Sequence, residues 1–253
     1  FAFGAKLATY TRDMLFSAGR ILAPAIGAME AKDGGSARAI GPLLSASSRN
    51  LLLVATPLFA YWVLFGGAFL EAWLDDRAFR DGGALPLTIL ALGSIAPVAT
   101  YPMLELHRGT NRMRSLALFC GIEGVANLVL SLMLVGPHGL AGVALGTAIP
   151  AFVIHGLVMP WWICRSLDLS FWHWLRGGCV VPLLAGTAIV VPGLLLVDLE
   201  ATFSWPVLIG SGIALLLVYG ALALLLMRVL RPADSDRLVY RDREGTAAPP
   251  RTG

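Results

Sequence analysis

The chain has 253 residues, of which 57% are hydrophobic and only 14% are charged, and its formal net charge is +3 at pH 7. Soluble domains carry about a quarter of charged residues, so this composition and a mean hydropathy of +0.75 argue against a soluble globular protein. The three cysteines show no CxxC spacing and have no nearby histidine, which argues against a disulfide framework or a metal site.

Seven long apolar stretches follow one another along the chain. They cover residues 1–30, 51–73, 84–104, 115–135, 139–164, 178–197 and 205–227. Each is close to the roughly 20 residues that a helix needs to cross the hydrocarbon core of a bilayer. The sequence therefore predicts an all-α integral membrane protein with about seven transmembrane helices.

Basic residues are distributed unevenly among the connections between these stretches. Connections 75–83, 136–139 and 198–204 either hold more Asp than Arg or hold no basic residue, whereas the other connections and the tail 231–253 are rich in Lys and Arg. Cytoplasmic loops retain Lys and Arg, so we expect those three connections outside and a disordered, basic, cytoplasmic tail. The basic excess thus indicates anionic lipid headgroups as partners, and no nucleic acid.

The first stretch contains a polar stripe. Its members recur at steps of three and four residues and share one helix face: Lys6, Tyr10, Asp13, Ser17 and Arg20. A charge at mid-bilayer costs roughly 2.5–3.5 kcal/mol on insertion scales, so we expect this face to meet other helices or a wet cavity. Lys6 and Arg20 would then bind an anionic substrate, and Asp13 would orient them or exchange a proton. The alternative is an internal ion pair that only locks the helix.

Arg12 lies off this stripe, where it can snorkel or meet a neighbouring helix, and it is a third candidate substrate contact. Further along, residues 31–50 are predicted to form a polar cytoplasmic loop around Gly34 and Gly35. Glu71 ends an apolar stretch close to Asp75 and Asp76, so we expect it to be solvated.

The fourth stretch offers a second polar face, formed by Arg112, Glu123, Asn127 and Ser131. Glu123 lies near the middle of its apolar stretch and is a candidate for ion coupling, although a bond between two helices would explain it equally well. The adjacent Gly121 and Gly124 would permit a close backbone approach. His155 stands alone in the next stretch, and we interpret it as a satisfied interhelical histidine rather than a proton relay.

The segment 167–176 differs from the other connections because aromatic residues alternate in it with polar ones, which predicts that it lies along the inner interface. The chain shows no HExxH, GxSxG or P-loop motif and no spaced carboxylate pair in a loop. We therefore expect a protein that is not an enzyme and that needs no cofactor.

Residues 123–149 read EGVANLVLSLMLVGPHGLAGVALGTAI. This resembles a helical hairpin of the polysaccharide flippases in the multidrug/oligosaccharidyl-lipid/polysaccharide exporter superfamily. The matching positions are Asn127, Leu130, Leu132, Leu134, Pro137, Gly139, Gly142, Ala144, Gly146 and Thr147. Residues 21–34 and 89–112 resemble two further helix ends of that family, so the resemblance covers about residues 5–165.

The resemblance implies one lobe of a two-lobe exporter fold: residues 1–165 as C-terminal-lobe helices, 166–230 as an interfacial segment with two accessory transmembrane helices, and 231–253 as the tail. With the odd number of spans and a first residue that is not Met, it implies a missing N-terminal half as partner. It also implies flipping of a lipid-linked oligosaccharide across the bacterial cytoplasmic membrane for surface polysaccharide.

Three alternatives stay open. One is a cation-coupled drug antiporter of the same superfamily, in which Asp13 or Glu123 would bind H⁺ or Na⁺. Another is a membrane-embedded enzyme of polysaccharide assembly, which should carry a large outer loop with paired Arg and His; the longest outer connection expected here is only 75–83. The third is a scaffold that does not transport.

Overall fold

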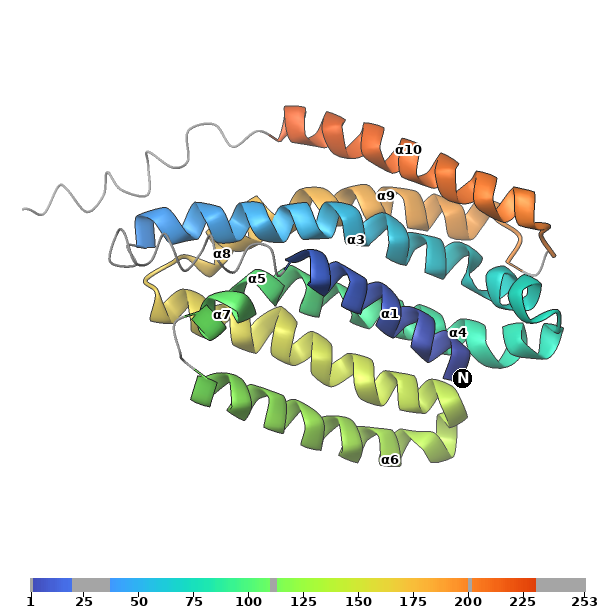
Figure 1. Ribbon diagram of the computed structural model, residues 1–253, viewed down its shortest axis with the longest axis horizontal. Coiled ribbons are helices and arrows are strands. Elements are labelled where there is room, and N and C mark those ends of the chain that lie inside the picture. Colours follow the sequence, from blue (N-terminus) through green and yellow to red (C-terminus); the bar gives the residue numbers. More distant parts are fainter. Residues whose placement is uncertain (1, 20–36, 110–112, 200–201, 231–253) are drawn as a thin grey trace, which may run out of the picture.

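The computed structural model describes residues 2–19, 37–109, 113–199 and 202–230. Within these residues the protein is helical and contains no strand. The helices are α1 (Ala2–Gly19), α3 (Ala37–Leu74), α4 (Arg77–Gly93), α5 (Ile95–Gly109), α6 (Met113–Val153), α7 (Met159–Ser166), α8 (Phe171–Trp174), α9 (Val180–Leu196) and α10 (Trp205–Val229), with π-helical turns η1 (Ile154–Val158) and η2 (Leu175–Cys179). Figure 1 shows the long helices side by side in one bundle.

Five helical segments among the described residues are long and apolar enough to cross a membrane. They are Ile40–Leu74, Arg77–Arg108, Arg114–Ser166, Phe171–Leu196 and Trp205–Val229. The described part of the chain is therefore all-helical, and the length and composition of its helices are those of a membrane protein. The count of seven spans stays a prediction.

The N-terminal part of α3 replaces a predicted loop. The expected polar loop 31–50 is wrong from Ala37 onward, because α3 already begins there. Ser45, Ser47 and Ser48 are buried in this part of the helix, where small hydroxyl side chains let a neighbour approach closely. Ser48 accepts a hydrogen bond of 3.0 Å from Nε1 of Trp174. Residues 31–36 lie outside the described residues.

α6 is a hairpin rather than one rod. Gly139 has φ of 55° and ψ of −133°, and the helix reverses there (Figure 1). A residue with a side chain rarely adopts this backbone conformation, so glycine suits the position. The predicted turn at 136–139 is confirmed. Residues 113–138 are called the first arm below, and residues 140–153 the second arm.

Small residues let the second arm pack closely, with Gly142 and Gly146 against the first arm and Ala148 against α4. Gly142, Ala144, Gly146 and Ala148 recur every second position and are all buried. A Cβ placed on Gly93 of α4 would lie 2.6 Å from the Cβ of Ala148, closer than real carbon atoms approach. The G-x-x-G-x-A-x-G-T pattern of residues 139–147 therefore corresponds to close helix packing through small residues, which is common between membrane helices.

The segment expected at the inner interface belongs largely to a long helical segment. Ser170 caps α8 by accepting a 3.3 Å hydrogen bond from the backbone N–H of His173, and helix continues through η2 into α9. Trp174 is only 4% exposed, because it packs in the core, whereas Trp172 is 64% exposed. Alternating aromatic and polar residues here thus reflect one buried and one exposed helix face.

The connections predicted to lie outside share one end of the bundle. In Figure 1 the start of α1, the turn from α3 to α4, the reversal of α6 and the end of α9 all lie at the right. The ring of Phe3 contacts Trp73 and Phe79 at centroid distances of 5.8 and 5.6 Å, and Arg80 donates a hydrogen bond to the carbonyl of Leu199. Their common placement agrees with the predicted topology, while the side of the membrane stays a prediction.

Candidate functional site

The charged stripe of α1 lies on the exposed face of this helix. Lys6 and Asp13 are exposed, whereas Ala8 and Leu15, on the opposite face, are each 2% exposed. The expectation that Lys6 and Asp13 face other helices is wrong for the helices described here. The face of α1 that carries small residues packs against the bundle instead, because small side chains allow a close approach. A Cβ on Gly4 would lie 3.0 Å from the carbonyl oxygen of Gly83 on α4.

Arg12 lies within ion-pairing distance of Asp13. Its Nε atom lies 3.7 Å from Oδ1 of Asp13, with side-chain exposures of 35% and 57%. The guanidinium also lies 5.8 Å from the ring centroid of Phe16, a cation–π distance. The third member of the predicted cationic set, Arg20, lies outside the described residues. The roles of Lys6, Arg12, Asp13 and Arg20 in substrate binding therefore stay predictions.

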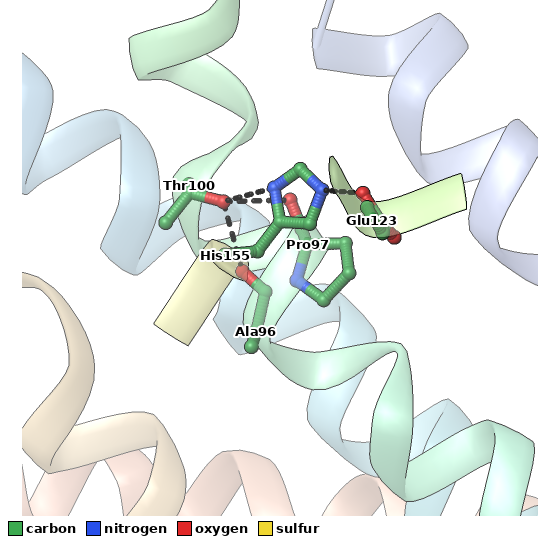
Figure 2. Close-up of polar contacts among 5 residues, drawn as sticks. All are labelled: Ala96, Pro97, Thr100, Glu123 and His155. Carbon is green, nitrogen blue, oxygen red and sulfur yellow. Dashed lines mark hydrogen bonds and ion pairs between the residues drawn. The ribbon is translucent and has the colours of Figure 1, made fainter. Parts of the chain in front are cut away.

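A second polar group lies where the first arm of α6 meets η1 and α5. Nε2 of His155 lies 3.1 Å from Oε2 of Glu123, and Nδ1 of His155 lies 3.4 Å from Oγ1 of Thr100 on α5 (Figure 2). Thr100 is fully buried, His155 is 8% exposed as a residue, and the Glu123 side chain is 25% exposed. The group thus reaches from the core to the surface of the bundle.

Local backbone geometry places His155 in this contact. It lies in η1, a π-helical turn between the second arm and α7. Such turns insert an extra residue and are frequent at functional sites. The interpretation of His155 as an interhelical histidine is confirmed, and the open alternative that Glu123 bonds another helix is also confirmed. Whether Glu123 couples ions stays a prediction.

The sequence patterns considered above gave no partner for Glu123 or His155, although the spacing of these two residues from Gly139 indicates that they pair. Glu123 and Gly139 are as far apart along the chain as Gly139 and His155. In an antiparallel hairpin that turns at Gly139, residues at equal distances from the turn lie opposite each other. Two ionisable residues in apolar stretches, placed symmetrically about a Gly-Pro turn, therefore predict a pair.

The rest of the predicted polar face continues this seam toward the turn. Ser131 Oγ lies 3.2 Å from Asn127 Oδ1 and 3.5 Å from the carbonyl of Val143 on the second arm. A Cβ on Gly146 would overlap Ser131. By contrast, Gly121 and Gly124 are exposed, and no other described element comes within 4 Å of a Cβ added there, so the expected close approach is wrong for the helices described here.

A buried arginine marks the end of the bundle near the α3–α4 turn. Arg80 lies 2.6 Å from Oε2 of Glu71, so the expectation of a solvated Glu71 is wrong. A hollow of about 230 Å³ lies beside this pair, and its lining includes Asp75, Asp76 and Arg77. The described part of the chain contains no group of three His, Cys, Asp or Glu residues placed to hold a metal ion.

All three cysteines are free, with Cys164 and Cys179 buried and Cys120 exposed. Comparison of the chain with protein-family models, curated proteins and solved structures found no match.

Proposed function

We propose that this chain forms one lobe of a two-lobe exporter that flips a lipid-linked oligosaccharide across the bacterial cytoplasmic membrane for surface polysaccharide. The observation that carries the proposal is the exposed ionisable face of α1, formed by Lys6, Asp13 and the partly exposed Arg12. α1 packs against α3, α4 and α5, whose sequences form candidate membrane spans.

A charged face beside membrane spans is costly if it meets lipid. It is stabilised if it lines a water-filled cavity, and a second lobe placed against α1 would create one. A lipid-linked oligosaccharide carries a phosphate-containing headgroup, which Lys and Arg side chains bind through charge-assisted hydrogen bonds. The resemblance of residues 5–165 to polysaccharide flippases supports the same substrate.

The first test determines whether the charged face of α1 is accessible to water. Single cysteines at positions 6 and 13, in a background without native cysteines, should react with a membrane-impermeant maleimide in the assembled protein. Cysteines at positions 8 and 15 are the matched controls, because Ala8 and Leu15 are buried on the opposite face. Absence of reaction at both 6 and 13 would place this face against lipid and remove the basis of the proposal.

The second test measures export. Lys6→Ala should slow the movement of lipid-linked oligosaccharide at unchanged protein abundance, and Lys6→Arg should retain part of the activity, because the positive charge remains. Arg228→Ala is the control, since it removes an exposed basic residue from the end of α10. Equal export by the Lys6→Ala and wild-type proteins would contradict phosphate binding at this position.

A cation-coupled drug antiporter is the second candidate, and the Glu123–His155 contact favours it, because such a pair can hold a proton within a candidate membrane segment. Transport of a cationic drug that is insensitive to Lys6→Ala but abolished by Glu123→Ala would select this function over flipping.

A further inference from the structure

We propose that Glu123 and His155 form a one-proton latch that holds the first arm of α6 against η1, and that loss of this proton releases the arm. The proposal concerns the conformation of the hairpin and holds for either transported substrate. It rests on the hydrogen bonds around His155 and on the exposure of the arm.

First, the direction in which the Thr100 hydroxyl donates its proton determines which nitrogen of His155 carries a hydrogen. This hydroxyl lies 3.0 Å from the carbonyl oxygen of Ala96, a backbone acceptor one turn earlier on α5, and 3.4 Å from that of Pro97 (Figure 2). A hydroxyl has one proton to donate. With that proton directed to these carbonyls, Thr100 accepts from His155, so Nδ1 of the imidazole carries a hydrogen. This tautomer is inferred from the hydrogen-bond network.

The second step is the contact on the other side of the ring. Nε2 and Oε2 of Glu123 are 3.1 Å apart, and one proton between them makes a hydrogen bond whichever atom carries it. Either His155 is an imidazolium and Glu123 a carboxylate, or His155 is a neutral imidazole and Glu123 a carboxylic acid. The pair has no net charge in both cases. Without the proton, the Nε2 lone pair faces a carboxylate. In a surrounding of low dielectric this contact is repulsive, and the carboxylate needs water.

The third step is the freedom of the arm to move. Most positions from Gly121 to Val135 are exposed, and the partly buried ones form a single seam that includes Glu123, Asn127 and Ser131. Apart from the adjacent residues and the helix's own backbone, no atom lies within 4 Å of a Cβ added at Gly121 or Gly124. The arm is thus lightly held around Glu123, while the turn at Gly139 lies at its far end and can serve as the pivot.

Other ionisable groups lie on the elements around the pair. On α5, Glu105 is ion-paired with Arg108 at 2.6 Å, and Tyr101 stacks on Phe16 at a centroid distance of 4.2 Å. On the arm itself, Cys120 is exposed one turn before Glu123. Further ionisable groups on these elements include His107 on α5, which lies 5.5 Å from the Trp162 ring, Arg165 on α7, which lies over Trp161, and Arg80 on α4, which pairs with Glu71.

The latch is tested by the distance between the arm and η1. Spin labels are placed at positions 118 and 157, where Leu118 and Leu157 are exposed, in the full chain reconstituted in lipid nanodiscs with its three cysteines replaced by alanine. Distances between the two spin labels are measured by double electron–electron resonance from about pH 5 to about pH 9, a range that brackets the ordinary titration of histidine.

We expect one short distance at low pH and a second, longer distance that grows as pH rises. Because one proton is released, the ratio of long to short populations can rise by at most about tenfold for each pH unit. Glu123→Gln should keep the short distance at every pH, because the amide N–H donates to Nε2 without a titrating proton. His155→Phe should show the longer distance throughout.

Glu105→Gln is the matched control, since it makes the same chemical change in another ion pair and should leave the pH response intact. A distance distribution that does not change with pH in the wild-type protein would overturn the latch. A pH response that persists in Glu123→Gln would also overturn the latch. This second outcome tests the latch even if the His155→Phe protein does not fold. No transported substrate is present, so the result is independent of the proposed function.

Discussion

Nη1 of Arg80 lies 2.6 Å from Oε2 of Glu71, and the two side chains are only 4% and 18% exposed. Arg80 also donates a hydrogen bond to the carbonyl of Leu199. One guanidinium therefore joins the end of α3, the start of α4 and the connection after α9. Planar guanidinium groups suit this task, because their donors point in several fixed directions.

The first prediction is that Arg80→Ala lowers the free energy of unfolding by about 3 kcal/mol, because it leaves a mostly buried carboxylate without its cation. Arg228→Ala, which removes an exposed arginine at the end of α10, should change this free energy by less than about 0.5 kcal/mol. Denaturant titration in detergent measures both. Removing Glu71 together with Arg80 should cost less than the two single changes added, and strict additivity would argue against the ion pair.

The second prediction compares glycines on the two sides of the α6 hairpin. Gly146→Ala should destabilise the protein by about 1–3 kcal/mol, because the new Cβ overlaps Ser131 on the first arm. Gly121→Ala should be neutral or stabilising by up to about 1 kcal/mol, because alanine favours helix and the position is open. Thermal unfolding of the two variants provides the measurement. Effects of the same sign would mean that the arms do not pack as described.

The third prediction concerns topology. Single cysteines at positions 76, 138 and 198 should react with an impermeant maleimide added to intact cells, because the charge bias places these connections outside. A cysteine at position 228, at the opposite end of the bundle, should react only after the cells are opened. Labelling in the reverse pattern would invert the orientation while leaving the fold unchanged.

The helical membrane class was predictable because apolar length and charge depletion are properties of the sequence alone. The turn at Gly139 was predictable for the same reason, since Pro and Gly interrupt an apolar stretch. The N-terminal part of α3 was not, because Ser45 and Ser48 resemble loop residues until a neighbouring helix is known to cover them. Local composition does not report what lies across an interface.

The site residues show the same limit. A helical period correctly placed Lys6 and Asp13 on one face of α1, but that period does not determine which face the other helices cover. The opposite face has Gly4 and Ala8, which allow a closer approach than charged side chains do, and this decided the packing. The pairing of Glu123 with His155 depends on hairpin geometry that a search for isolated motifs did not use.

The hairpin of α6 also affects how the protein is made. The first arm leaves the ribosome before the residues that its polar seam contacts, so the carboxyl of Glu123 and the hydroxyl of Ser131 reach the bilayer ahead of His155 and Val143. Chains fold in the order of their synthesis where they can, but here the earlier helix depends on the later one. The hairpin together with η1 is therefore the smallest piece of this region that can enter the bilayer with the carboxyl of Glu123 already paired.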